Sequence, residues 1–198
     1  MTPGAMVASH APSGARSVGF DRRRMVRMVF GLVALLTGAF VLYRPALRIG
    51  LLSDDYALLM WARRLELLPR DWGQIRPLPI VTWHLLAATT TAADTPGVLH
   101  AWNVALHGLN AVLLWRLARR FTASLMSAVA AAVVFLALPT SVEPVAWASG
   151  VFDVMLTTLT LMLASVATAR QDLRLVDVAL CLVLTVAMFA TKETGVIA

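Results

Sequence analysis

The sequence has few charged residues and almost no cysteine. Asp, Glu, Lys and Arg make up 14% of its 198 residues, whereas soluble domains carry about a quarter. The single cysteine, Cys181, lies in an apolar run, which excludes a disulfide framework or a cysteine metal site. Hydrophobic residues are abundant instead, at 59%, and the mean hydropathy is +0.76. The composition therefore predicts an integral membrane protein rather than a soluble domain.

The basic residues are clustered rather than dispersed. They outnumber the acidic residues 17 to 11, which gives a net charge of +6. They gather in short links between long apolar runs, a placement typical of cytoplasmic loops of membrane proteins. We therefore expect membrane lipid as a partner and no nucleic acid. Sixteen of the 17 are arginine, which is typical of a GC-rich, bacterial genome, so we expect the cell (inner) membrane.

Apolar runs predict an all-α fold with about five transmembrane helices. An α-helix needs about 20 residues to cross a hydrocarbon core of about 30 Å. The predicted spans are residues 25–43, 97–118, 122–138, 145–168 and 175–190. The first run is not read as a signal peptide, because no small-x-small cleavage site follows it. Residues 1–20 are polar and aperiodic, so we expect a disordered cytoplasmic tail before a membrane domain at 21–198.

Basic links give the predicted orientation. The segment before the first span and the links 116–120 and 169–174 are rich in arginine. The positive-inside rule places all three, and the N-terminus, in the cytoplasm. The loop 44–96, the turn at 139–144 and the end at 191–193 then lie on the extracytoplasmic side.

The long first loop contains two apolar stretches of its own. Leu58, Trp61, Ala62, Leu65 and Leu68 recur at helical spacing after Ser53, which predicts a helix lying in the membrane interface. Residues 78–88 form a second stretch that is too short to span. A loop of this length with internal helices is more often functional than a simple connector.

Adjacent carboxylates open the first loop helix. Asp54 and Asp55 follow Ser53, and a serine cap with acidic residues in the first turn is a common helix start. Two neighbouring carboxylates also raise each other's pKa, which suits a general base. Both interpretations stay open, and for the second we favour Asp55 as the base with Asp54 assisting.

Two basic residues are candidates to bind a phosphate on the extracytoplasmic side. Arg76 is suited to paired hydrogen bonds with phosphate, although it is equally suited to snorkelling towards lipid headgroups. Lys192 and Glu193 follow the fifth span, where either a solvated ion pair or a phosphate-binding lysine fits.

Polar residues also occur inside the predicted spans. His100, Asn103, His107 and Asn110 share one face of the second span, which favours hydrogen bonds between helices over a metal site. Glu143 lies at the start of the fourth span. Asp153 is expected about 15 Å further along that helix, where an acid needs a partner or a polar cavity.

The order of these motifs resembles the GT-C superfamily of membrane glycosyltransferases. The motifs are SDDY, RPL, NVALHGLN followed by LLWRL, P-x-x-x-E-P-V-A-W-x-x-G-x-x-D, and KETG. The resemblance carried by their order extends over about residues 25–198. The chain is most similar to the protein O-mannosyltransferase-like branch, of which it is expected to be an N-terminal portion. It departs from related sequences at Leu138, where histidine is frequent, and at Val151, where arginine is frequent.

The resemblance implies an enzyme that transfers a hexose from a polyprenyl-phosphate donor. It further implies that the acidic pair includes the catalytic base, and that residues 139–153 and Lys192-Glu193 line one cavity. The acceptor, a protein or a glycan, is not specified by the sequence. No cofactor is expected with certainty, and a divalent cation stays open. The alternatives are a non-catalytic membrane fragment and a transporter or lipid-handling protein.

Overall fold

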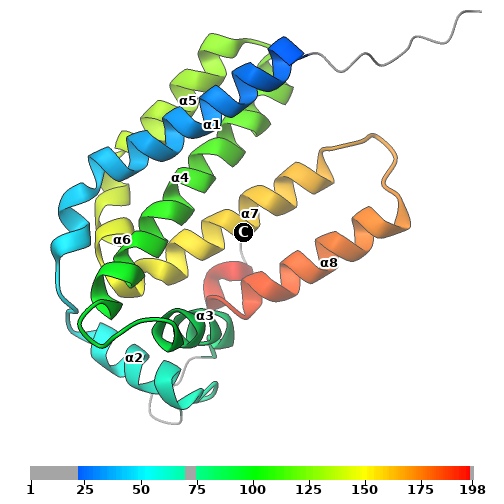
Figure 1. The fold of residues 1–198 in the computed structure, drawn as a ribbon. Coiled ribbons are helices and arrows are strands. Elements are labelled where there is room, and N and C mark those ends of the chain that lie inside the picture. Colours follow the sequence, from blue (N-terminus) through cyan, green and yellow to red (C-terminus); the bar gives the residue numbers. More distant parts are fainter. Residues whose placement is uncertain (1–21, 70–74, 197–198) are drawn as a thin grey trace, which may run out of the picture.

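The computed structural model describes residues 22–69 and 75–196, and every regular element in these two ranges is helical (Figure 1). The longer helices are α1 (Arg22–Leu42), α2 (Asp54–Arg64), α3 (Pro77–Ala88), α4 (Thr95–Thr122), α5 (Leu125–Ala137), α7 (Val151–Ala167) and α8 (Leu175–Phe189). The short ones are η1 (Arg44–Arg48), η2 (Pro139–Ser141), α6 (Val142–Ala146), η3 (Ala148–Gly150) and η4 (Glu193–Val196). The all-α prediction is confirmed for these ranges, and the predicted tail at 1–20 lies outside them.

Length and composition support fewer membrane-crossing helices than the five predicted. Within the described ranges, α4 and the segment Ala148–Ala167 are long and apolar enough to cross. The helices Leu125–Ala137 and Pro139–Ala146 meet at a bend of 51°. They form a third membrane-crossing segment only if the two are counted as one bent span. A helix does lie over each predicted run, so the positions of the runs were correct and the count of five is not supported.

Two of the remaining helices are short. α1 itself has 21 residues, of which Val29–Leu42 is the apolar part among the described side chains. α8 has 15 residues, which rise about 22 Å against a hydrocarbon core of about 30 Å. α5 has 13 residues and ends at Ala137, because the next residue, Leu138, has an extended backbone, as expected of a residue that precedes proline.

α4 is the central helix of the fold. It packs against α1, α5 and α7, while α7 also packs against α8, and α2 against α3. Gly108 lets α1 come close, because an added Cβ would lie 3.0 Å from Leu36 Cδ2 and 3.2 Å from the Ala39 Cβ. The connections α4–α5 and α7–α8 and the start of α1 lie at one end of the long helices, and α2, α3, α6 and η4 lie at the other (Figure 1).

The polar face of α4 holds backbone groups of its neighbours. Asn103 Nδ2 donates to the carbonyls of Trp147 (2.8 Å) and Ala148 (3.1 Å), and Asn110 Nδ2 donates to the carbonyl of Val154 at 3.1 Å. The prediction of hydrogen bonds between helices is confirmed for these two residues. By donating to two consecutive carbonyls, Asn103 joins the break before α7 to α4.

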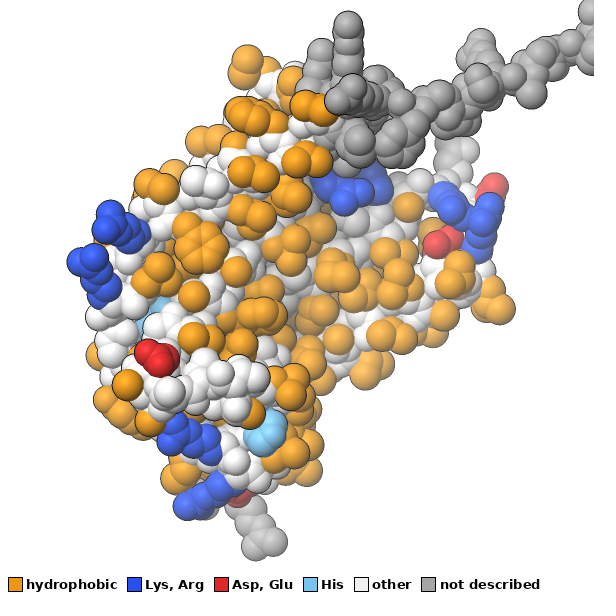
Figure 2. All heavy atoms as spheres, viewed as in Figure 1, with side chains coloured by type: hydrophobic (Ala, Val, Ile, Leu, Met, Phe, Trp, Pro, Cys, Tyr) orange, Lys and Arg blue, Asp and Glu red, His pale blue; other side chains and the backbone are white. Residues whose placement is uncertain are grey.

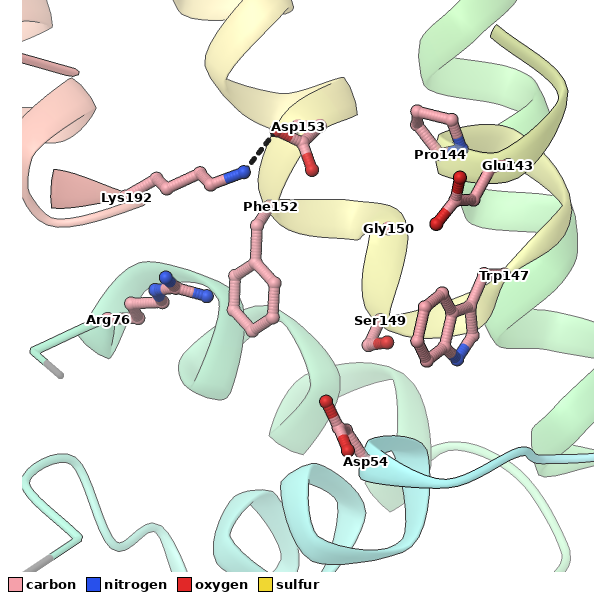
Figure 3. A pocket seen from close by; sticks show the side chains of 10 residues that line it. All are labelled: Asp54, Arg76, Glu143, Pro144, Trp147, Ser149, Gly150, Phe152, Asp153 and Lys192. Atoms are coloured by element: carbon pink, nitrogen blue, oxygen red, sulfur yellow. Dashed lines mark hydrogen bonds and ion pairs between the residues drawn. The ribbon is translucent and has the colours of Figure 1, made fainter. Parts of the chain in front are cut away.

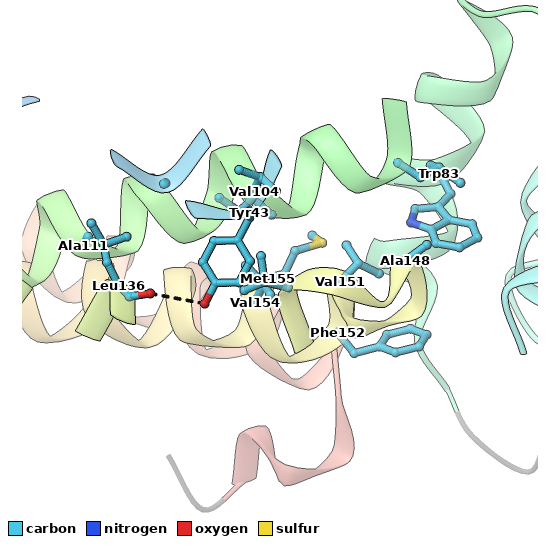
Figure 4. Close-up of a cluster of buried hydrophobic side chains, with 14 of the residues drawn as sticks. Tyr43, Trp83, Val104, Ala111, Leu136, Ala148, Val151, Phe152, Val154 and Met155 are labelled. Carbon is cyan, nitrogen blue, oxygen red and sulfur yellow. Dashed lines mark hydrogen bonds between the residues drawn. The ribbon is translucent and has the colours of Figure 1, made fainter. Parts of the chain in front are cut away.

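The end of α5 is held in a similar way. The hydroxyl of Tyr43 donates to the carbonyl of Leu136 at 3.2 Å, as the dashed line in Figure 4 shows. The Tyr43 ring also meets the ring of His107 edge to face, with centroids 5.2 Å apart. These contacts join α1, α4 and α5 at the level where α5 stops.

The surface of the bundle is largely apolar. Figure 2 shows hydrophobic side chains covering the middle of one face, with basic side chains gathered towards its edges. Exposed apolar residues lie on α1, α5 and α8, among them Val33, Val41, Val133, Val134, Leu182 and Val186. Water-soluble proteins rarely expose apolar surface on this scale. The apolar surface and the few helices long enough to cross a membrane both indicate a membrane protein.

Candidate functional site

A tight turn positions the acidic pair before α2. The amide of Asp55 donates to the carbonyl of Leu52 at 2.8 Å, and Ser53 between them has φ 40° and ψ −111°. This left-handed region is costly for a non-glycine residue. The Ser53 hydroxyl does not cap α2 as predicted, because it donates to Asp54 Oδ1 at 3.0 Å instead. The turn therefore sets the directions in which the two carboxylates point.

Asp55 is fully buried and makes structural contacts. Its Oδ2 accepts from the amide of Leu52 at 2.8 Å, and its Oδ1 accepts from the amide of Ser149 at 2.7 Å. Both oxygens thus bind backbone N–H groups, which are strong partners for a carboxylate. Asp55 connects the start of α2 to η3, 94 residues further along the chain.

The predicted fourth span is broken at its start. Trp147 is extended (ψ 131°), and η3 separates α6 from α7. Gly150 makes this packing possible, because an added Cβ would lie 2.1 Å from the carbonyl oxygen of Pro144. The prediction of a continuous helix over 145–168 was therefore wrong in its first turns. Asp153 lies in the first turn of α7 and not 15 Å along a span.

A cavity of about 310 Å³ lies where α2, α3, η3, α7 and the segment after α8 meet (Figure 3). Its lining combines acidic, basic and aromatic side chains. The lining residues are Asp54, Arg76, Glu143, Pro144, Trp147, Ser149, Gly150, Phe152, Asp153 and Lys192. It lies at the same end of the bundle as the loop helices, the side predicted to be extracytoplasmic.

Arg76 is the more enclosed cation of the cavity. Its Nε lies 3.2 Å from each carboxylate oxygen of Glu193, and its Nη2 donates to Oε2 at 2.8 Å. The guanidinium also stacks over the ring of Phe152, 4.6 Å from the centroid. The hydrogen bonds from Arg76 lower the pKa of Glu193 below its ordinary value. This pair connects the first loop to the segment after α8.

Lys192 is the second cation. Its Nζ lies 2.5 Å from Asp153 Oδ1, so a residue predicted to follow the fifth span forms an ion pair with one predicted inside the fourth. The pair is partly exposed, with 24% of the lysine side chain and 47% of the aspartate side chain accessible. Asp153 thereby has the partner that an acid near a membrane requires.

Two further carboxylates of the cavity, Asp54 and Glu143, carry no ion pair within the described residues. Both side chains are exposed, and within the described part of the chain Asp54 accepts only the hydrogen bond from Ser53. The cavity therefore combines carboxylates open to solvent with cations already paired. Such a set can accept a proton on one group while it holds an anion on others.

Most of the residues predicted from sequence come together here. Asp54, Arg76, Glu143, Asp153 and Lys192 line the cavity, and Glu193 contacts Arg76 beside it. Asp55 does not line it. Sequence reasoning did not single out Trp147, Ser149 or Phe152, because their roles come from contacts with residues far away in the chain. The P-x-x-x-E-P-V-A-W-x-x-G-x-x-D motif spans all three, but it specifies only Trp147 and leaves Ser149 and Phe152 at variable positions.

No metal centre is evident in residues 22–69 and 75–196. No group of three or more His, Cys, Asp or Glu side chains there is arranged to hold an ion. His100 is fully buried, and neither of its ring nitrogens has a hydrogen-bond partner among the described residues.

Comparisons of the chain with protein-family models, with curated proteins and with solved structures found no match. What the cavity does must be inferred from its own geometry.

Gly150→Ala should destabilise the protein and distort the cavity, because the new Cβ would overlap the Pro144 carbonyl. We expect a loss of about 1–3 kcal/mol, as for other overpacked sites. Gly50→Ala is the matched control, since no atom lies within 4 Å of its added Cβ, and should change stability by about 0.5 kcal/mol or less. Thermal unfolding in detergent measures both. Equal midpoints for the two variants would contradict the packing at η3.

The ion pair of Arg76 and Glu193 should weaken in acid. The folded protein lowers the pKa of Glu193, so the stabilisation is present above the ordinary glutamate pKa and is lost as the pH falls through the lowered value. Wild-type protein should therefore unfold at a higher temperature than Glu193→Gln at neutral pH, and the two should converge in acid. A difference that stays constant from pH 7 to pH 3 would show that the charge of Glu193 contributes nothing.

Proposed function

We propose that this chain is a glycosyltransferase, or the N-terminal part of one, that uses a sugar linked to a polyprenyl phosphate. The supporting observation is the cavity that brings the carboxylate of Asp54 together with the cations Arg76 and Lys192. The order of motifs that resembles GT-C glycosyltransferases supports the same reaction class. The acceptor would be a protein or a glycan on the extracytoplasmic face.

The reaction requires a base and anion stabilisation. Asp54 would take the proton of the acceptor hydroxyl while the acceptor oxygen forms a bond to C1 of the sugar. The bond between C1 and the phosphate oxygen breaks, and its electron pair stays on the polyprenyl phosphate. Arg76 and Lys192 would bind that phosphate and stabilise the developing charge. The leaving group is already a weak base, so little help from a general acid is needed.

The contacts of the acidic pair favour Asp54 as the base over Asp55. Asp55 is fully buried, and both of its oxygens accept backbone hydrogen bonds. Asp54 is exposed and lines the cavity. A base must lie within hydrogen-bond reach of the proton that it removes, and of the two only Asp54 faces the space where an acceptor fits.

The proposal places the cavity on the extracytoplasmic side of a five-span domain in the inner membrane. The short helix α8 would cross with local thinning of the bilayer or with interfacial residues completing the span, whereas α1, with 21 residues, has the length of a full span. The arginine-rich α4–α5 and α7–α8 connections would then be cytoplasmic. α2 and α3 would lie in the opposite interface.

Single cysteines test this orientation after Cys181→Ser removes the native thiol. Arg119 follows the span of α4 at its basic end, and Thr140 is exposed near the cavity end. In intact cells an impermeant maleimide should label Thr140→Cys and leave Arg119→Cys unlabelled until the cells are opened. The reverse pattern would put the cavity in the cytoplasm and remove the lipid-linked donor from its reach.

The catalytic proposal is tested by Asp54→Asn, which keeps the size of the side chain and removes the base. Sugar transfer from a polyprenyl-phosphate donor should fall about 10²- to 10⁴-fold in membranes containing the chain expressed with its complete reading frame. Expression and thermal stability should stay close to those of the wild type.

Two matched variants separate this role from others. Asp94→Asn changes an exposed aspartate that does not line the cavity, and should transfer sugar at the wild-type rate. Asp55→Asn weakens a buried hydrogen-bonded link and should lower stability by about 1–3 kcal/mol. If Asp54→Asn transfers as fast as Asp94→Asn, the base assignment fails, and a non-catalytic membrane segment becomes the better description.

A further inference from the structure

The cations of the cavity already hold carboxylates of this chain. Three hydrogen bonds join Arg76 to Glu193, and an ion pair joins Lys192 to Asp153. We propose that Glu193, assisted by Asp153, occupies the position that the donor phosphate takes, so that donor binding exchanges a carboxylate for a phosphate. This inference rests on the proposed function. It explains how the chain's own carboxylates would keep other anions out of the donor site.

The carboxylate of Glu193 suits this role by its geometry. It receives hydrogen bonds from two nitrogens of one guanidinium, which is also how arginine binds phosphate oxygens. A phosphate brings the same acceptor geometry with more oxygens. It can therefore take over the bonds of Glu193 without a change in the position of Arg76.

The two partners differ in how easily they can move. The side chain of Arg76 is 11% exposed and lies over Phe152, whereas that of Glu193 is 49% exposed. The amide of Leu78 donates to the carbonyl of Ala190 at 3.0 Å, so the two backbones stay joined when the side-chain pair opens. When the ion pair opens, Glu193 is therefore the group that leaves.

The two exchanges are coupled through the chain. Lys192 and Glu193 are consecutive residues, and each pairs with a different element, α7 and the start of α3. Gly195 keeps the segment after them close to α8, since an added Cβ would lie 2.8 Å from the Met188 carbonyl oxygen. A phosphate that binds both cations would release both carboxylates from one short segment.

Displacement by the donor is energetically feasible. Ion pairs exposed to solvent contribute little, because water screens them and the side chains lose freedom. A phosphate held by both a guanidinium and an ammonium forms more charge-assisted bonds than one carboxylate does. A weaker monoanion such as chloride lacks these bonds and would leave Glu193 in place. The ion pair of Arg76 and Glu193 therefore makes the site selective for multivalent oxyanions over simple monoanions.

The test is the binding of farnesyl phosphate, a prenyl phosphate without sugar, to the purified full chain in detergent. Glu193→Gln keeps the shape of the side chain and removes the competing charge, so binding should tighten about two- to fivefold. Asp153→Asn should act in the same direction at Lys192, and provides a second variant should the first fail to fold. Arg76→Gln should weaken binding.

Glu143→Gln is the matched control. Glu143 lines the same cavity, but within the described residues it pairs with neither cation, so this variant measures the general effect of removing one negative charge. Tightening by Glu193→Gln beyond that of Glu143→Gln supports the exchange. Equal or weaker binding overturns it and makes Glu193 a positioning residue for Arg76.

Failure of the exchange and failure of the proposed function have different signatures. If Arg76→Gln weakens farnesyl phosphate binding but Glu193→Gln and Asp153→Asn do not tighten it, the exchange is wrong and the phosphate site stands. If Arg76→Gln leaves binding unchanged, both the exchange and the phosphate role of Arg76 are overturned. If Glu193→Gln tightens farnesyl phosphate binding while Asp54→Asn transfers sugar at the wild-type rate, the exchange stands. In that case only the assignment of Asp54 as the base is wrong.

Discussion

The site depends on one buried carboxylate. Asp55 accepts hydrogen bonds from the amides of Leu52 and Ser149, so it fixes the start of α2 against the break before α7. Burying a carboxylate is costly unless hydrogen bonds replace its water, and these two bonds do so. The loop helices have a second polar link where Leu78 meets Ala190. Together the two links hold the loop, and with it Asp54 and Arg76, against α7 and the segment after α8.

A helix break creates the position of the remaining side chains. A continuous helix from residue 145 would have carried Asp153 away from the loop, whereas η3 places it in the first turn of α7 beside Lys192. The carbonyls of Trp147 and Ala148 accept backbone amides of the break itself, and each takes a further hydrogen bond from Asn103. Asn103 therefore joins the break to α4. The polar face of α4 thus has a structural role that makes the cavity possible.

Sequence predicts the parts of this arrangement that depend on local pattern. Apolar runs located the helices, and the motifs identified most of the charged residues of the cavity. Length and composition do not support the count of five crossings, because α8 has 15 residues and α5 stops before Pro139. Which aspartate faces the cavity was not predictable. Neighbouring residues on a helix point about 100° apart, and only the distant amide of Ser149 decides which one turns inward.

The charges of the cavity divide into two sets with different tasks. Arg76 and Lys192 lie with Asp153 on one side in Figure 3, and Glu143 and Trp147 lie on the other. The paired carboxylates, Asp153 and Glu193, keep the cations in place without leaving two positive charges to repel each other. Asp54 and Glu143 form no ion pair with a cation within the described residues. A phosphate is therefore best bound beside Arg76 and Lys192. A hydroxyl that must lose a proton is best bound beside the unpaired carboxylates.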